Sequence, residues 1–440
     1  MKPQYLVWVS LLWSMAAAAT MLEHTHRSKI AGIDVITYIS NVKDVVVITG
    51  ALPAGDAMAD PGNAAIPTLS AMMLDRGTTN RDKFAIARQL DNVGASLSFN
   101  VGTQSLSISA KFLKKDLGLV IGLIAEELRN PKLQPEEFAK AKQQLIGSLE
   151  ASSQNTEARA QEAFARAAFP EGHPNHPHST AEVQAAAKLA TLQDVKAFQA
   201  KYYGPDHLTL VLVGDVPVTL AEAEIGRVFA GWTGGQSYIR APQTAQSSSA
   251  REFSVPLADK PSVSVILGEP TGLQYRDPDA LALRLGTAIF GHGFTGRLMS
   301  SVRDKEGLTY DIGAAVTEDS ITDGVWDISA SFAPSLLDKG LAATRRELAR
   351  WWQEGVTDKE LSERKQGMIG GYRVGLSSTA GIAFAIMSCV QRGYDLPWLD
   401  QYPEAVNALT KDQVNHAIRA HLDPSKMVLV KAGSVATAAR

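Results

Sequence analysis

The chain has 440 residues, a formal net charge of −3 at pH 7 and 45% hydrophobic residues, a composition typical of a globular protein large enough for two or three domains. The near-neutral charge excludes the basic footprint of proteins that bind nucleic acid or anionic membranes. A single cysteine, Cys389, excludes an intrachain disulfide and a zinc site built from several thiolates.

The first 19 residues have the parts of a secretory signal in the usual order. Lys2 precedes an apolar run at 5–13, and small residues follow at 16–19. The run is shorter than the about 20 apolar residues of a membrane span. We therefore predict a signal peptide over residues 1–19 and an exported, periplasmic protein without stable membrane insertion, with an uncleaved anchor as the alternative.

Residues 29–235 are predicted to form a first α+β domain. Apolar residues at helical spacing indicate helices, one of which Gly94 closes, and strict alternation indicates half-buried antiparallel strands. In chain order, the predicted elements are a strand at 44–51, helices at 64–74 and 81–93, strands at 97–101 and 106–112, and helices at 115–129, at 135–152 and on to 168.

The second domain, residues 253–440, is predicted to repeat this plan after a linker at 236–252 that is rich in Gly, Ser, Gln and Pro. Its predicted elements are a helix at 277–290, strands at 312–316 and 326–332, and helices at 335–354 and 358–374. Cys389 lies in an apolar stretch and is expected to be a buried small hydrophobe.

Two pairs of segments show that the chain is a tandem duplication. Thr191–Val216 aligns with Thr410–Val435 without a gap, and Leu133–Gly147 aligns upstream with Val356–Gly370 at nearly the same offset. Two matching blocks in the same order indicate a repeated unit of roughly 200 residues. The predicted fold class is α+β, with two homologous halves that are each an antiparallel sheet backed by helices.

This layout resembles the pitrilysin/insulinase family of zinc metallopeptidases (inverzincins) over nearly all of residues 29–435, particularly its short bacterial members akin to mitochondrial processing peptidase subunits. Catalytic members carry H-x-x-E-H on the first helix of the N-terminal half. This spacing places two imidazoles one turn apart to hold zinc, beside a Glu that activates the zinc-bound water. The resemblance implies a clamshell of two halves that closes around peptides.

The zinc motif is missing from the matching segment of this chain. When the segment is anchored on the ending at 74–78, Thr68 and Met72 stand where the histidines would be, and Ala71 replaces the glutamate. None of these side chains is a suitable zinc ligand or general base. Near the expected third ligand only Glu150 carries a carboxylate. We therefore predict a vacated zinc site and no metal on this chain.

Five histidines elsewhere in the chain are candidate metal ligands. His24 and His26 follow the predicted signal at i, i+2 spacing, and a processed or frayed terminus is the favoured interpretation. His173, His176 and His178 are close enough in sequence to bind a transition metal. Because prolines interrupt them, we favour a surface loop without metal and keep an independent hydrolase as a rival hypothesis.

The segment at 293–310 is the stretch most similar to the family. It contains Arg303 near a predicted helix end and Tyr310 at a strand start, at the spacing of the family's arginine–tyrosine pair. The resemblance implies that this pair binds substrate carbonyl oxygens and the developing oxyanion at a facing zinc site. A guanidinium and a phenol suit that task. The alternatives are a cation favoured by the helix dipole and a tyrosine packed on a sheet. Arg297 and the neighbouring glycines are expected to be structural.

From these residues we predict a non-catalytic, substrate-orienting subunit of a heterodimeric zinc metallopeptidase that acts on peptides. A paralogous partner with H-x-x-E-H would supply zinc and base, and this chain would supply Arg303 and Tyr310. Alone it is expected to be inactive. The alternative is a peptidase-like binding or scaffold protein with no part in hydrolysis.

Overall fold

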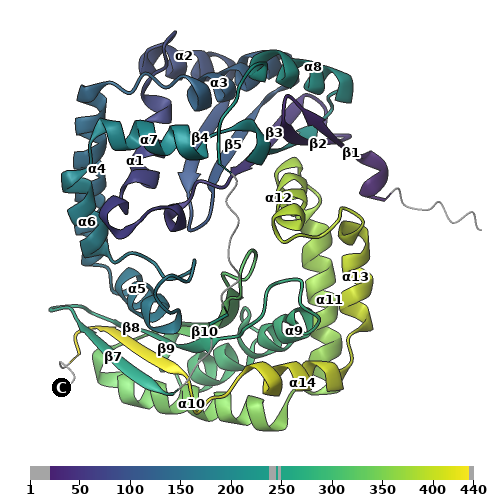
Figure 1. Cartoon of the computed structure of the whole chain (residues 1–440). Helices are drawn as coiled ribbons and strands as arrows, with labels where there is room; N and C mark the ends of the chain where they lie inside the picture. The colour runs from purple at the N-terminus through teal and green to yellow at the C-terminus, as the bar shows by residue number, and fades with distance from the viewer. Residues whose placement is uncertain (1–19, 237–243, 246–248, 436–440) are drawn as a thin grey trace, which may run out of the picture.

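The computed structural model describes residues 20–236, 244–245 and 249–435, so the predicted signal peptide and most of the predicted linker lie outside the described residues. The described chain forms two halves, each a sheet with helices on it, which lie one above the other in Figure 1. The predicted α+β class is confirmed.

The first half is built on a six-stranded sheet of order β1-β2-β6-β3-β5-β4 within the described residues. Its strands are β1 (Thr25–Ile30), β2 (Ile33–Ile39), β3 (Val45–Leu52), β4 (Ser96–Val101), β5 (Leu106–Leu113) and β6 (Thr209–Gly214). Its helices are α1 (Ile66–Met72), α2 (Lys83–Val93), α3 (Leu117–Arg129), α4 (Pro135–Ser153), α5 (Thr156–Ala168), α6 (Thr180–Leu189), α7 (Leu192–Tyr202) and α8 (Val218–Phe229).

The second half carries a five-stranded sheet of order β7-β11-β8-β10-β9 among the described residues. Its strands are β7 (Arg251–Pro256), β8 (Val263–Pro270), β9 (Thr309–Thr317), β10 (Val325–Phe332) and β11 (Val428–Gly433). Its helices are α9 (Ala280–Gly291), the π-helix η7 (Met299–Lys305), α10 (Leu337–Glu354), α11 (Asp358–Gly375), α12 (Thr379–Gln391), α13 (Trp398–Ala408) and α14 (Lys411–His421).

The duplication predicted from sequence is visible in the strand order. Apart from β1, the order β2-β6-β3-β5-β4 matches β7-β11-β8-β10-β9 strand for strand. The sheets are antiparallel except for one parallel pair in each, β2 with β6 and β7 with β11. Both β6 and β11 come late in the sequence of their half, after α7 and α14 respectively, and insert between its first two long strands, which the sequence pattern did not reveal.

The matching blocks also share local chemistry. Thr191 begins α7 and Thr410 begins α14 with the same capping box, in which the threonine and the third helical residue each bond to the other's backbone N–H. Both helices lead into the inserted strand. The repeated sequence therefore encodes a repeated helix–strand unit.

The two halves exchange one helix each. In Figure 1, α5 of the first half lies on the second sheet and α12 of the second half lies on the first. Phe164 on α5 packs with Ile266 and Val430, and Ile386 on α12 packs with Val47 and Val211. Each sheet is thus covered on one face by its own helices and on the other by a helix of the opposite half. Two apolar cores tie the halves together.

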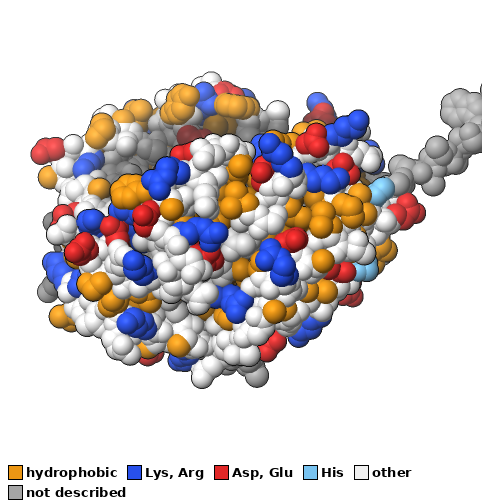
Figure 2. All heavy atoms as spheres, turned by 90° about the horizontal axis from the view of Figure 1, so that it is seen from above, with side chains coloured by type: hydrophobic (Ala, Val, Ile, Leu, Met, Phe, Trp, Pro, Cys, Tyr) orange, Lys and Arg blue, Asp and Glu red, His pale blue; other side chains and the backbone are white. Residues whose placement is uncertain are grey.

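The surface shows charges of both signs. Figure 2 views the molecule from above the first half, where Lys and Arg side chains are interspersed with Asp and Glu. Among the described residues no single helix is both long and apolar enough to cross a membrane, although α11 and α12, bent by 113° at their junction, would pass together on length and composition alone.

Candidate functional site

The helix that matches the family's zinc helix is α1, and its side chains are those of a packed core. Ala71 is buried, and the half-buried Met72 packs against the hydrophobic core of the first half. Thr68 Oγ1 lies 3.5 Å from Asp56 Oδ1. Burial raises the pKa of Asp56 to about 6, against the opposing effects of Thr68 and His178. The structure therefore places one carboxyl group beside the vacated position.

The third predicted ligand position lies on α4, away from any donor set. Glu150 is exposed, and its carboxylate accepts a hydrogen bond of 3.2 Å from the Gln184 amide. Within the described residues, no three His, Cys, Asp or Glu side chains lie close enough to hold one metal ion.

The structure brings Arg303 and Tyr310 together. Arg303 lies on the π-helix η7, the left-handed Gly307 (φ 63°) follows two residues after its last residue, and Tyr310 lies in β9. The Arg303 guanidinium carbon is 4.8 Å from the centre of the Tyr310 ring and 5.2 Å from that of Phe294. Two aromatic rings thus hold one guanidinium by cation–π contacts, and Phe294 was not anticipated from the sequence.

Tyr310 of this pair faces outward, and the Arg303 side chain is 26% exposed. Tyr310 is 82% exposed and Phe294 is 72% exposed. Within the part of the chain that the structure describes, the Tyr310 hydroxyl has no hydrogen-bond partner, and the only carboxylate near Arg303 is that of Asp304, 4.0 Å from its Nε. We call Phe294, Arg303 and Tyr310 the exposed arginine clamp.

Arg297 in the same segment is different. Its guanidinium donates to both Glu360 oxygens, at 2.6 and 2.7 Å, and to the Gly355 carbonyl at 2.8 Å. Gly291 packs so closely on β9 that a Cβ would lie 2.3 Å from the Ala314 nitrogen. The expectation that Arg297 and the neighbouring glycines are structural is confirmed.

The three-histidine loop is not a surface loop, which corrects the prediction. His173 is fully buried, and its Nε2 lies 3.0 Å from Asp323 Oδ1 of the second half. Asn175 donates to the Glu318 and Asp323 carbonyls. The loop therefore joins the two halves.

The other two rings of the loop are also engaged. The Nδ1 of His176 lies 2.8 Å from the Phe169 carbonyl, and the Nε2 of His178 lies 3.0 Å from that of Ala59. Each imidazole is directed at a different protein acceptor, so the three rings do not converge on one point. The geometry gives no support to the rival hydrolase hypothesis.

The N-terminal histidines belong to ordered structure rather than to a frayed end. His26 lies in β1, where its Nε2 is 3.3 Å from Glu222, and His24 lies against the Tyr38 ring at 5.7 Å. The first half therefore begins with a paired strand before residue 29.

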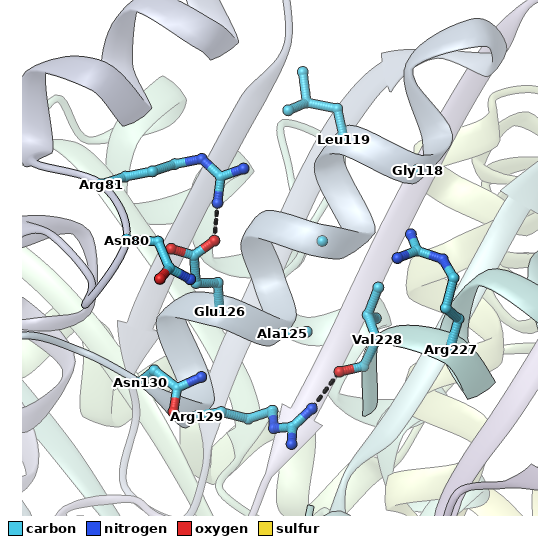
Figure 3. A pocket seen from close by; sticks show the side chains of 11 residues that line it. Asn80, Arg81, Gly118, Leu119, Ala125, Glu126, Arg129, Asn130, Arg227 and Val228 are labelled. Carbon is cyan, nitrogen blue, oxygen red and sulfur yellow. Dashed lines mark hydrogen bonds and ion pairs between the residues drawn. The ribbon is translucent and has the colours of Figure 1, made fainter. Parts of the chain in front are cut away.

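A polar cavity of about 350 Å³ lies on the outer side of the first half, between α3, α8 and the loop before α2 (Figure 3). Arg81 is bonded to Glu126, and Arg129 donates to the carbonyls of Val228 and Ala230. Figure 3 shows the Arg81 guanidinium directed at Glu126 and that of Arg129 directed at Val228. They hold helices and loop together, so this cavity offers no evident chemistry.

The fold and the site define a peptidase-like protein of two homologous halves whose first half lacks the zinc motif. The family model "Insulinase (Peptidase family M16)" matches residues 38–180, and the model "Peptidase M16 inactive domain" matches residues 190–368. The chain belongs to peptidase family M16, and the resemblance to the pitrilysin/insulinase family is confirmed.

Some relatives are described as proteases and one as a non-peptidase homolog. The chain is 21% identical over 429 residues to the "Non-peptidase homolog YmxG" of Helicobacter pylori, which covers 96% of both chains. It is 24% identical over 349 residues to an "Uncharacterized zinc protease" of Rickettsia bellii, which covers 78% of this chain and 82% of the relative.

Solved structures have the same fold. A structure described as a peptidase M16 inactive domain from Pseudomonas fluorescens has a TM-score of 0.83 and 25% identity, covering 94% of this chain and 98% of that one. The periplasmic protease PqqL from Escherichia coli has a TM-score of 0.76 and 14% identity, and the match covers 98% of this chain but 49% of PqqL.

Proposed function

We propose that this protein is the non-catalytic, substrate-orienting subunit of a heterodimeric zinc metallopeptidase that acts on peptides. A paralogous M16 subunit with H-x-x-E-H supplies zinc and the general base. This chain supplies Arg303 and Tyr310, which donate hydrogen bonds to a substrate carbonyl and to the oxyanion that develops from it. The observation that carries the proposal is the exposed arginine clamp, in which Tyr310 is exposed and the partly exposed Arg303 has its nearest described carboxylate, that of Asp304, 4.0 Å away.

The duplication argues against a purely structural role for the clamp. Gly94 and Gly307 end the equivalent helices with nearly equal left-handed φ angles of 64° and 63°, and each leads into the edge strand of its sheet. The Gly94 N–H bonds to the Asp91 carbonyl as the Gly307 N–H bonds to the Arg303 carbonyl, so the first half has Asp91 where the second has Arg303. Counted forward from these glycines, it has Leu97 where the second has Tyr310. The same turn therefore forms without a guanidinium or a phenol.

The proposed reaction needs two chains, because the first half of this chain lacks the zinc motif and the second half supplies only the arginine–tyrosine pair. Thr68, Ala71 and Met72 hold no zinc, so water activation must come from the partner. An arginine held between two rings keeps its fork of donors in one orientation, which favours binding of carbonyl oxygens. Extended peptides can add hydrogen bonds along an edge strand such as β9.

The test is a titration of this chain into a fixed amount of the H-x-x-E-H paralogue, with cleavage of a quenched fluorescent peptide as the readout. We expect a saturable rise near equimolar ratio. Arg303→Leu, which removes the guanidinium, should lower the activity of the pair by about 10²–10³-fold, as for loss of one oxyanion donor. Tyr310→Phe keeps the ring over Arg303 and should lose activity by removing only the hydroxyl.

The matched control is Arg350→Leu, which removes an arginine from the exposed face of α10 where it pairs with Glu354. It should leave the activity of the pair unchanged. Dimerisation is measured separately by sedimentation. If the Arg303→Leu pair forms and cleaves peptide normally, the clamp has no catalytic role and the scaffold alternative replaces it.

We also propose that the protein is exported to the periplasm. The support is the signal-like order of residues 1–19 together with the fold shared with a periplasmic protease. Fractionation of cells that express the full chain tests this, and recovery of uncleaved protein from the cytoplasm would refute it.

A further inference from the structure

A second cavity, of about 270 Å³, lies in the second half. It is lined by α11, α12, α13, the segment between α12 and α13, and the segment before α9. Six aromatic side chains line it, namely Tyr275, Tyr372, Phe384, Tyr394, Trp398 and Tyr402. The cavity is smaller than the about 300–1,000 Å³ typical of sites for whole drug-sized ligands. It therefore suits one side chain rather than a cofactor.

The aromatic wall is ordered by ring contacts. Tyr394 and Trp398 stack with ring centres 4.4 Å apart and an interplanar angle of 4°. Tyr372 lies 4.7 Å from Tyr402, and the edge of Tyr275 meets Tyr394 at 6.1 Å. The Tyr372 hydroxyl donates to the Leu399 carbonyl at 2.6 Å. The cavity is thus preformed by side chains that already hold one another.

One face of α12 keeps the cavity open because its side chains are small. Gly381, Ala385 and Ser388 line the space at helical spacing. Cys389 also lines it, and burial raises the pKa of this thiol to about 11, so it is not a reactive thiolate. The cavity is a binding feature rather than a nucleophilic centre.

A positive charge lies at one end of this aromatic space. The Arg392 guanidinium carbon is 3.7 Å from the centre of the Tyr275 ring, and Arg284 lies on the same ring at 4.2 Å. Arg284 is paired with Asp319. Arg392 has no carboxylate within ion-pair distance among the residues that the structure describes, and its Nε lies 3.5 Å from the Ser320 hydroxyl.

We propose that this cavity binds the carboxyl-terminal residue of a peptide whose last side chain is apolar, with the terminal carboxylate on Arg392. The aromatic wall matches an apolar or aromatic side chain. A planar guanidinium without an acidic partner matches a carboxylate. Two guanidinium groups around Tyr275 disfavour a cationic ligand, which such a cage would otherwise suit.

The rim of the cavity fits the rest of a peptide. Phe384 lines the cavity and is 68% exposed. An exposed large apolar side chain at the mouth of a cavity provides a contact for preceding residues. The site binds a peptide end whether or not the arginine clamp takes part in hydrolysis.

The experiment uses the full chain and a fluorescein-labelled pentapeptide that ends in Phe with a free carboxylate, followed by fluorescence anisotropy. The same peptide with a carboxyl-terminal amide, and one ending in Lys, are the ligand controls. We expect at least tenfold weaker binding for both. Equal binding of the amide would overturn the role of Arg392, and equal binding of the Lys peptide would overturn the apolar pocket.

Two variant pairs test the location. Ala385→Leu fills the cavity and should abolish binding, whereas Ala380→Leu, on the same helix outside the lining, should not. Arg392→Gln should weaken the free-acid peptide at least tenfold without affecting the amide, whereas Arg373→Gln on α11 should change neither. Thermal unfolding of each variant verifies folding. Full binding by a folded Ala385→Leu protein would refute the site.

Free N-acetylphenylalanine separates two sources of the same chemistry. It should compete for the site but bind more weakly than the peptide, which also contacts Phe384. If the free acid binds and the peptide does not, the site takes a small aromatic acid and the peptide proposal is wrong.

Discussion

The buried pair of His173 and Asp323 allows a sharp test of how the halves are held together. The Asp323 carboxylate lies 3.0 Å from the His173 ring and accepts a 2.7 Å hydrogen bond from the Ala245 amide. The side chains of the pair are 0% and 5% exposed. In Asp323→Ala the imidazole and the amide keep their burial but lose their partner. Each buried donor left without its acceptor costs about 1–3 kcal/mol, so the loss for the two donors should be about 2–6 kcal/mol.

The chain contains a matched control. His421 and Asp279 lie at the same 3.0 Å separation, but within the second half and with side chains 21% and 39% exposed. Because water solvates this pair, Asp279→Ala should cost about 0–1 kcal/mol. Urea denaturation measures both, and limited proteolysis reports whether the halves separate first in Asp323→Ala. An equal loss of unfolding free energy in the two variants would refute the argument that burial makes the His173–Asp323 pair important for stability.

Three further predictions concern stability. Ile386→Ala, on the exchanged helix α12, should lower the free energy of unfolding by about 2–5 kcal/mol. Val374→Ala, at an exposed position, should change it by less than about 0.5 kcal/mol. Similar urea midpoints for the two variants would contradict this difference. Burial and a neighbouring carboxylate raise the pKa of Glu127 to about 8, so the folded state retains a proton that the unfolded chain releases near its ordinary pKa of about 4.3. The free energy of unfolding should therefore fall as pH rises between these values, and Glu127→Gln should remove that slope in urea titrations across pH 4–8. Burial opposes ionisation of Glu360, but hydrogen bonds from Arg297 and the helix cap outweigh it and lower the pKa of Glu360 to about 2. The ionised carboxylate therefore stabilises the folded state above about pH 4.3, and this contribution is lost as the pH falls toward 2. Arg297→Ala should make the free energy of unfolding depend less on pH in this acid range.

Much of the fold was predictable because the repeat and the local periodicities agree. The strand predicted from alternating apolar residues at 106–112 is β5, and the helix predicted at 358–374 is α11. The exchange of α5 and α12 was not predictable. An apolar stripe shows that a helix buries one face, but it does not show which sheet receives that face.

The candidate site could be predicted from the sequence only where its residues lie close together along the chain. Arg303 and Tyr310 are seven positions apart in the sequence, and this spacing, which matches the family's arginine–tyrosine pair, was enough to predict them as a pair. The cavity beside Arg392 was not visible in the sequence, because its walls come from the segment before α9 and from three later helices. Similarly, the partner of His173 is 150 residues away, so the loop looked like a surface loop.

The exchanged helix α12 connects the two features that the sequence could not reveal. Ile382, Ile386 and Met387 on one face pack on the first sheet, while Ala385 and Ser388 on another face line the aromatic cavity. A ligand in the cavity would therefore contact the helix that holds the halves together. Anything that binds the folded state alone stabilises it by mass action, so occupancy of the cavity should also resist separation of the halves. The binding site and the joint between the halves are thus two faces of one helix, and a change on either face must be checked on both.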